Sequence, residues 1–381
     1  MRVYLDHNAT SPLRPAVKAA MLAALDSHGN AASVHAEGRK QFHALDGARS
    51  TLAWTLGVNA EGVIFTSGGT EANNLALRGT QAEYLLVSAI EHPSVLEAAK
   101  SSSKVADIVP VDGNGLVRLD ALKAKLGRRN TLVSIMLANN ETGVIQPLNE
   151  IVDMVHEAGA LLHVDAVQAV GKMAREMAGP SHSDHINFAL LKCDMMSVSA
   201  HKIGGPVGAG ALLVRDRIEL SPLLAGGGQE SRRRSGTENI SAIVGFAEVM
   251  KSPALYPYRP VWRDMLETAL PPEAVVFSKD APRLGNTTCF AIPGMSAETL
   301  LMALDLEGFA VSSGSACASG KVGRSHVLSA MGVPKELAAC AIRVSQGWTT
   351  KRDEISAFNA ALTRLHEKHK LRNAGQRQNH G

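Results

Sequence analysis

Met195-Met-Ser-Val-Ser-Ala-His-Lys202-Ile-Gly-Gly-Pro206 begins as an apolar run of strand length and ends in small and polar residues around a lysine. A second run of this kind, Leu161-Leu-His-Val-Asp165-Ala-Val-Gln168, lies upstream and ends in an acid. In a parallel sheet the carboxyl ends of neighbouring strands converge on one crevice, so Asp165 and Lys202 can meet a single ligand. The two runs therefore predict an α/β fold with a ligand site at the ends of its strands.

An aspartate and a lysine placed in this way are typical of a site for pyridoxal 5'-phosphate. That cofactor needs a lysine amine for its resting Schiff base, and a carboxylate against its pyridine nitrogen to keep the ring protonated. Plainer interpretations also fit the spacing, since an aspartate at a strand end commonly caps a helix and a lysine is commonly a solvated surface residue. Spacing alone leaves both interpretations open.

Composition limits the class of protein. The chain has 381 residues, of which 45% are apolar and 20% are charged, and its net charge is +3. Two domains are expected at this length. The tight basic cluster Arg232-Arg-Arg234 is too small to indicate a nucleic-acid partner. The first residues carry an acid, Asp6, where a signal peptide needs an apolar core, and no apolar run is long enough to cross a membrane, so we expect a cytoplasmic protein.

Strand and helix patterns alternate along most of the chain. Apolar runs predict strands at 62–65, 84–88, 131–136, 161–164, 195–198, 209–214, 287–292 and 342–345, and helical spacing predicts helices at 12–25, 39–56, 151–158 and 297–306. This alternation predicts a large α/β domain, 12–252, with a mainly parallel sheet flanked by helices. A Pro-rich segment, 251–260, separates it from a smaller α+β domain that we expect to comprise 1–11 and 253–381. The polar tail from Lys368 to Gly381 is predicted to be frayed.

An anion site is indicated by Phe65-Thr-Ser-Gly-Gly-Thr70-Glu-Ala-Asn-Asn-Leu75, which follows a predicted strand and opens a predicted helix. Backbone amides at a helix N-terminus bind phosphate, and Gly68 and Gly69 permit a tight turn and a close approach to the ligand. Taken alone, the motif is equally an ordinary capped helix start.

Eight segments in one order resemble a known family. They are Tyr4-Leu-Asp-His-Asn-Ala-Thr10, Thr66-Ser-Gly-Gly-Thr-Glu71, Glu91-His92, Asn139-Asn-Glu-Thr-Gly143, His163-Val-Asp-Ala-Val-Gln168, Ser199-Ala-His-Lys202, Arg234-Ser-Gly-Thr237 and Ser312-Ser-Gly-Ser-Ala-Cys317. Together they resemble the cysteine desulfurases of the NifS/IscS type, in the class V aminotransferase group with the type I pyridoxal-phosphate fold. The resemblance extends from Tyr4 to about Leu362.

The resemblance implies a role for each matching residue in binding the cofactor. Lys202 would hold pyridoxal phosphate as a Schiff base and move the substrate proton, while Asp165 would pair with the ring nitrogen and Gln168 with the phenolic oxygen. His92 would stack on the ring and assist proton transfer, although a capping or core histidine is the plainer interpretation. The remaining cofactor contacts would come from Gly69, Thr70, Asn140, Ser199 and His201, and from Thr237 toward the neighbouring subunit's cofactor in a homodimer with shared active sites.

The substrate end of the site is implied in the same way. Asn140 and Arg343 would bind the substrate, with the Arg343 guanidinium clamping its carboxylate. An arginine within the apolar run Ala341-Ile-Arg-Val-Ser345 needs a partner if it is buried, which independently favours an anion site.

Cys317 determines the reaction that we expect. It lies among small residues, Val311-Ser-Ser-Gly-Ser-Ala-Cys-Ala-Ser-Gly320, which predict an exposed loop rather than a core. Cys289 is predicted to be a buried structural cysteine, and Cys193 and Cys340 to be inert. The resemblance implies that the enzyme converts L-cysteine to L-alanine and that Cys317 receives the sulfur as a persulfide. An iron–sulfur scaffold or another sulfur-carrier protein would accept it, and a transient iron–sulfur ligand at Cys317 is the one metal role considered.

Other functions share part of this pattern. A selenocysteine lyase or a cysteine sulfinate desulfinase would use nearly every residue named, and a non-catalytic assembly subunit would keep the fold. A dinucleotide-binding oxidoreductase is disfavoured because no G-x-G-x-x-G follows the first strands. His182 and His185 are spaced for a metal, but their Pro- and Ser-rich surroundings favour a solvated loop.

Overall fold

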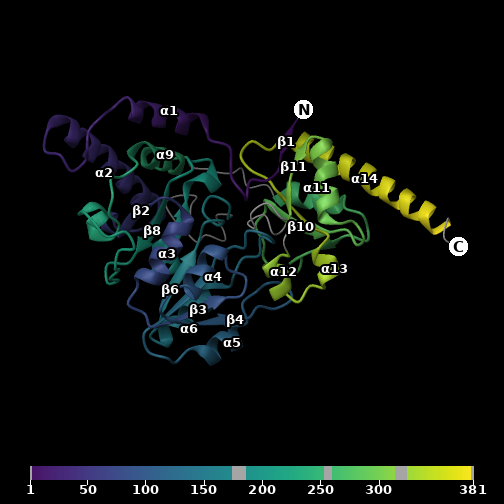
Figure 1. The fold of residues 1–381 in the computed structure, drawn as a ribbon, viewed down its shortest axis with the longest axis horizontal. Coiled ribbons are helices and arrows are strands. Elements are labelled where there is room, and N and C mark those ends of the chain that lie inside the picture. The colour runs from purple at the N-terminus through teal and green to yellow at the C-terminus, as the bar shows by residue number, and fades with distance from the viewer. Residues whose placement is uncertain (1, 174–185, 253–259, 314–323, 379–381) are drawn as a thin grey trace.

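The central sheet of the protein has mainly parallel strands. The computed structural model describes residues 2–173, 186–252, 260–313 and 324–378, and within these ranges the sheet has seven strands (Figure 1). Their order is β2 (Val63–Thr66), β8 (Gly210–Val214), β7 (Met195–Ser199), β6 (Leu161–Asp165), β5 (Thr131–Met136), β3 (Tyr84–Ser88) and β4 (Val105–Val109). β8 runs antiparallel to both of its neighbours, and the strands from β7 to β4 are parallel. The predicted α/β architecture is confirmed.

Helices cover both faces of this sheet (Figure 1). Successive residues of β2 point to opposite faces, so Val63 belongs to one apolar core and Ile64 to another. The first core also contains residues of α2 (Ala36–Leu56), α6 (Leu148–Glu157) and α9 (Ile240–Met250), with α1 (Pro15–Leu25) packed on α9. The second contains residues of α3 (Gly69–Gly79) and α4 (Pro93–Lys100). Both faces of the inner strands are therefore buried, which explains their continuous apolar runs.

A smaller α+β unit joins the two ends of the chain. β1 (Val3–Tyr4) pairs in parallel with β11 (Phe309–Ala310), and a separate sheet has the order β12 (Ser312–Ser313), β13 (Ala341–Ser345), β10 (Thr287–Ala291) and β9 (Val275–Val276). Their apolar core includes Leu5 with residues of α10 (Pro260–Thr268), α11 (Ala297–Leu306) and α14 (Arg352–Gln378). The division into a domain 12–252 and a smaller one of 1–11 and 253–381 stays a prediction. The remaining helices are α5 (Leu119–Lys125), α8 (Phe188–Leu191), α12 (His326–Ala330) and α13 (Lys335–Ala338).

Two expectations about the elements were wrong or incomplete. The tail from Lys368 is not frayed at its start, because α14 continues to Gln378 and Lys370 forms an ion pair of 2.9 Å with Glu273. The edge strand β4 was missed, since most of its residues are exposed or half-buried and lack the apolar run of a central strand. Within the described ranges, no helix is long and apolar enough to cross a membrane.

The N-terminal segment runs between the two units and positions the site. Asp6 forms an isolated bridge with Ser345, and the His7 ring is fully buried, with Ser11 Oγ at 3.0 Å and Thr349 Oγ1 at 3.3 Å from its two nitrogens. A Cβ at Gly347 would lie only 1.9 Å from His7 Nδ1. Close packing of His7 therefore depends on a glycine at position 347.

We predict that Gly347→Ala lowers the free energy of unfolding by about 1–3 kcal/mol, because the His7 ring has no room to move away from the new methyl group. Chemical denaturation measures the change. Gly113→Ala is the matched control, since a Cβ at Gly113 meets nothing within 4 Å. Equal stability of the two variants would show that His7 is not held as described.

Candidate active site

A cavity of about 320 Å³ opens at the carboxyl ends of β5, β6 and β7. The residues that the family resemblance assigns to the cofactor and substrate of the same subunit all line this cavity: Gly69, Thr70, His92, Asn140, Asp165, Gln168, Ser199, His201, Lys202 and Arg343. Seven further lining residues were not predicted, namely Asn8, Ala9, Asn73, Ser94, Met136, Ala138 and Val167. The structure thus gathers the predicted residues in one place.

Asp165 lies at the end of β6 and is 5% exposed. Its Oδ2 accepts a hydrogen bond from Asn73 Nδ2 at 2.8 Å, and its Oδ1 accepts one from the Val167 backbone amide at 3.0 Å. These donors fix the carboxylate without adding a positive charge beside it. Asn73 was missed from the sequence, although its place one helical turn after Thr70 was a usable signal.

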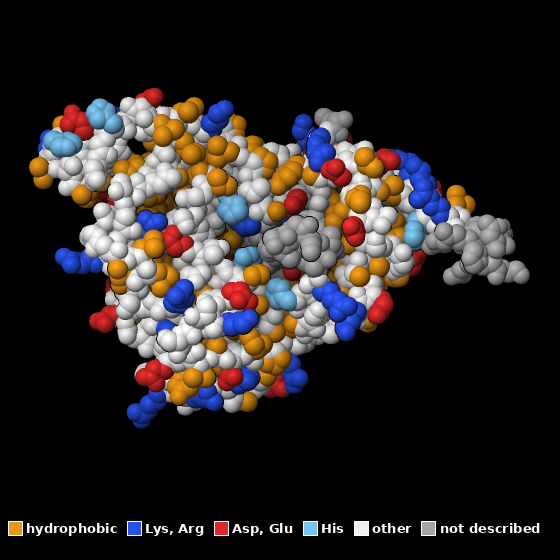
Figure 2. Space-filling view, viewed as in Figure 1, with side chains coloured by type: hydrophobic (Ala, Val, Ile, Leu, Met, Phe, Trp, Pro, Cys, Tyr) orange, Lys and Arg blue, Asp and Glu red, His pale blue; other side chains and the backbone are white. Residues whose placement is uncertain are grey.

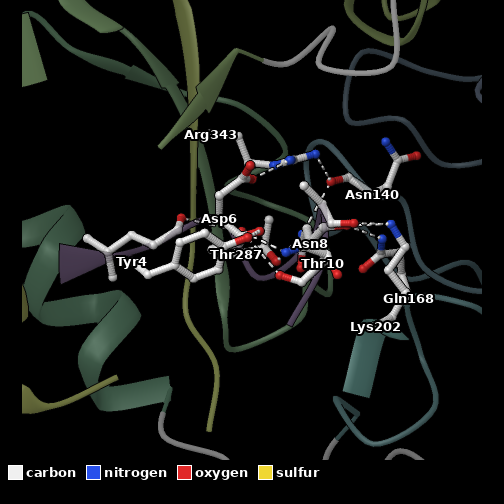
Figure 3. A network of polar contacts seen from close by, with 12 residues as sticks. Tyr4, Asp6, Asn8, Thr10, Asn140, Gln168, Lys202, Thr287 and Arg343 are labelled. Carbon is white, nitrogen blue, oxygen red and sulfur yellow. Dashed lines mark hydrogen bonds and ion pairs between the residues drawn. The ribbon is translucent and has the colours of Figure 1, made fainter. Parts of the chain in front are cut away.

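Lys202 follows β7 in the short 3-10 turn Ala200–Ile203. Its Nζ donates to the backbone oxygens of Asn8 at 2.9 Å and Ala9 at 2.7 Å, so the amine faces the N-terminal segment across the cavity (Figure 3). His201 Nδ1 lies 3.1 Å from Thr10 Oγ1, and burial, followed by the charges of Lys202 and Lys172, lowers the pKa of His201 to about 4. His201 is therefore neutral at pH 7.

One end of the cavity has the features of an anion site. α3 begins at Gly69 with its first amides directed to this end, and a Cβ at position 69 would lie 2.8 Å from a Val167 methyl group. Ser199 also lines the cavity, and its Oγ is buried without a hydrogen-bond partner among the described residues. A buried hydroxyl without a protein partner is expected to bind a ligand or a water molecule.

His92 both caps a helix and lines the cavity, so the two interpretations of its role are compatible. As the N-cap of α4 its Nδ1 accepts from the Ser94 amide at 3.1 Å, which puts the proton of the neutral ring on Nε2. Burial is the largest cause that lowers the pKa of His92; Asp165 opposes it, while Lys202 and His326 add to it. The ring is therefore neutral near pH 7 and can accept a proton only at the expense of its cap.

Arg343 is 2% exposed and has an anionic partner within the chain. Its Nη2 forms an ion pair of 2.7 Å with Asp6, and its Nη1 donates to the Asn140 backbone oxygen at 2.9 Å (Figure 3). The expectation that a buried arginine here needs a partner is confirmed, but Asp6 supplies that partner. A role in substrate binding stays a prediction.

Thr237 does not lie among the cavity-lining residues. Thr237 is exposed, and the 2.8 Å ion pair between Arg234 and Glu71 ties its segment to α3. Cys317 lies outside the described residues, as do His182 and His185. The three other cysteines are buried, as predicted for Cys289, and burial raises the pKa of the Cys193 and Cys289 thiols. That Cys193 and Cys340 are inert stays a prediction.

Asn8 was missed, although its hydrogen bonds reach three of the predicted site residues, Asn140, Gln168 and Lys202. Its Nδ2 donates to Thr287 Oγ1 at 2.9 Å and to the Asn140 backbone oxygen at 3.2 Å (Figure 3). Its backbone oxygen accepts from Gln168 Nε2 at 3.0 Å as well as from Lys202. A polar residue in a short N-terminal motif gives no sequence signal for contacts this distant.

The comparisons with known proteins define the class of protein. Residues 3–358 match the family model described as aminotransferase class-V. A cysteine desulfurase of Cereibacter sphaeroides is 40% identical over 366 residues, which make up 92% of each chain. A solved NifS-like protein from Rickettsia africae superposes with a TM-score of 0.86 at 34% identity, over 96% of this chain and all of that one. A structure described as SspA in complex with cysteine gives 0.78 at 29% identity, over 92% of this chain and all of that one.

The fold and the strand-end site are therefore those of the class V aminotransferases, and the chain belongs to this family. Within it, the relatives place the chain among the cysteine desulfurases of the NifS/IscS type, as the motifs indicated.

Glu91, next to His92, makes the stability of the folded protein depend on pH. Burial raises the pKa of its carboxyl from 4.5 to about 8, with Asp165 contributing, although Ser88 and the Met136 amide donate to Oε1. Glu91 is thus protonated at pH 7, and Asp165 is the one acid among the described lining residues.

We predict that Glu91→Gln removes part of the pH dependence of stability. Because the folded chain holds this proton more tightly than the unfolded chain, Glu91 makes stability fall as the pH rises from 4.5 to about 8, by about 1.4 kcal/mol per pH unit. Denaturation between pH 5 and 7.5 should show that slope reduced in the variant. Exposed Glu83→Gln is the control, and an unchanged slope in Glu91→Gln would contradict a protonated Glu91.

Proposed function

We propose that this chain is a pyridoxal-phosphate-dependent cysteine desulfurase that converts L-cysteine to L-alanine and passes the sulfur to Cys317. The observation that carries the proposal is that Asp165, Lys202 and Ser199, whose hydroxyl has no partner among the described residues, line one cavity. The chain around that cavity belongs to the family. The sulfur would then leave for an acceptor such as an iron–sulfur scaffold or a sulfur-carrier protein.

The residues present fit the cofactor. The α3 N-terminus and the unpartnered Ser199 hydroxyl suit its phosphate, with Thr70 and His201 beside them. Asp165, held by two neutral donors, suits the ring nitrogen. Lys202 supplies the amine, and when bound the cofactor supplies an electron sink that weakens the bonds at the substrate Cα.

The chain's own groups would handle the substrate and its protons. Arg343 would bind the substrate carboxylate through its guanidinium, with Asn140 beside it. Release of Lys202 Nζ from the carbonyl oxygens of Asn8 and Ala9 frees the amine to take and return the Cα proton. His92 would assist through Nε2, since Nδ1 is committed to the cap of α4.

Cys317 would complete the reaction as a nucleophile. Its thiolate attacks the substrate sulfur, an S–S bond forms, and the C–S bond breaks with its electron pair left on the substrate carbon, which takes a proton to become the methyl group of alanine. Cysteine and one thiol thus give alanine and one persulfide. A thiol reductant then releases sulfide and restores Cys317.

A homodimer would complete each site through Thr237. Apolar side chains gather over α1 in Figure 2, and Leu22 and Leu25 of this helix are 54% and 65% exposed. Such a surface is typical of a subunit interface. In this arrangement the exposed Thr237 would reach the partner's cofactor, while Arg234 and Glu71 hold its segment.

The purified protein should be yellow and should produce alanine and sulfide in equal amounts from L-cysteine with a thiol reductant. Lys202→Ala should lose the visible absorbance of the Schiff base and lower the rate by about 100-fold or more. Exposed Lys123→Met should match the unaltered protein. A colourless unaltered protein that takes up no pyridoxal phosphate would overturn the proposal, and a faster turnover of selenocysteine would reassign the substrate.

Cys317→Ala should keep the cofactor spectrum, and its response to L-cysteine, while sulfide release falls by about 100-fold or more because no thiolate remains to take the sulfur. Mass spectrometry should find an extra sulfur atom on Cys317 of the unaltered protein after one turnover. Cys340→Ala, which alters a buried thiol, is the control. Full sulfide release by Cys317→Ala would remove the persulfide step and leave the cofactor assignment intact.

A further inference from the structure

Lys172 is a second lysine beside the site, and the reaction described above gives it no task. It is 2% exposed, lies four residues after Gln168, and does not line the cavity. Burial is the largest cause that lowers its pKa far below the ordinary value, and the charges of Lys202 and Arg343 add to the effect against Asp6. A buried amine is costly to keep, which points to a specific contact.

The Lys172 amine contacts two side-chain amides. Its Nζ donates to Asn8 Oδ1 at 2.9 Å and also to Gln168 Oε1. Both of these amides have their other ends in the active site, since Gln168 and Asn8 line the cavity. Lys172 therefore lies behind the cavity wall and touches its residues from the outside.

An amide side chain has one donor end and one acceptor end, and its partners decide which end faces which way. Lys172 Nζ donates to Gln168 Oε1, so this end of the amide is turned toward Lys172. Its Nε2 then points to the Asn8 backbone oxygen, which only accepts, at 3.0 Å. If a ligand draws Nε2 away from Asn8, Lys172 is the remaining contact that keeps the amide from flipping.

The same reasoning holds for Asn8. Lys172 and Asn286 Nδ2 both donate to Asn8 Oδ1, at 2.9 Å and 3.4 Å. Asn8 Nδ2 is thereby directed at the Asn140 backbone oxygen, the atom that also accepts from Arg343 Nη1. The Lys172 amine thus orients the Gln168 amide on the cofactor side of the cavity and the Asn8 amide on the substrate side.

We propose that Lys172 is a positioning residue that holds Gln168 Oε1 and so presents Gln168 Nε2 as a hydrogen-bond donor to the bound cofactor. The proposal rests on the proposed function, in which the phenolic oxygen of pyridoxal phosphate accepts from Gln168. Lys172 itself touches neither cofactor nor substrate. Its contribution passes through Gln168, which makes the two residues energetically coupled.

The test is a double-mutant cycle on cofactor binding, with Lys172→Met, Gln168→Ala and the double variant. We expect Lys172→Met to weaken the affinity for pyridoxal phosphate by about 10-fold, as for the loss of one well-placed hydrogen bond. In the Gln168→Ala background the same change should cost less than about twofold, because the amide that Lys172 orients is gone. Exposed Lys123→Met is the control for loss of a lysine charge.

The visible absorbance gives a readout that a merely structural role would not move. Each single variant should shift the absorbance maximum of the bound cofactor in the same direction, and the double variant should shift it no further. Equal losses of affinity in the two backgrounds, or no loss in either, would overturn the positioning role while the proposed function stands. If the unaltered protein binds no cofactor, both proposals fall.

Folding of the variants is checked on the apoprotein. Chemical denaturation of the same four proteins should show coupling between Lys172 and Gln168 of about fivefold or more in the unfolding equilibrium constant. Additive effects of Lys172→Met and Gln168→Ala on unfolding would show that the contact between Lys172 and Gln168 does not exist in solution. If Lys172→Met does not fold, Lys172→Gln, which retains one donor group, enters the cycle in its place.

Discussion

The backbone oxygen of Asn8 is the acceptor on which the site depends. It receives Lys202 Nζ from the turn after β7 and Gln168 Nε2 from the turn after β6, while the Asn8 side chain reaches Thr287 of β10. The N-terminal segment therefore binds both the large sheet and the small one. A shift of this segment would remove partners from Lys202 and Gln168 together, so the packing of His7 against Gly347 becomes a condition for the geometry of the cavity.

Burial around this segment controls which groups carry charge. Burial lowers the pKa of His163 to about 3 and raises that of Glu91 to about 8, so both are neutral at pH 7. The ion pair with Asp6 offsets the charge of Arg343. Asp165, by contrast, is held by neutral donors alone. Asp165 is the one acid among the described lining residues, and a low-dielectric surrounding strengthens the effect of its charge.

The sequence predicted what local pattern determines. β3 and β5 were predicted with their observed bounds, because nearly every residue in each is buried and apolar runs record this directly. The motif residues at the ends of β6 and β7 were predicted because the strand ends of a parallel sheet share one edge. Lys172 and Asn8 are 164 positions apart, and Asn73 and Asp165 are 92 apart. No local pattern encodes such pairs, which arise only when helices and N-terminal segment pack on the sheet.

The ends of the segment that carries Cys317 follow from the same packing. Ser312 pairs with Arg343 across β12 and β13, so the chain leaves the small sheet beside the residue proposed to bind the substrate carboxylate. It returns at Ser325, whose Oγ donates to Glu141 Oε2 at 2.5 Å, next to Asn140. The two described ends of this segment therefore lie beside Arg343 and Asn140, the residues proposed to bind the substrate.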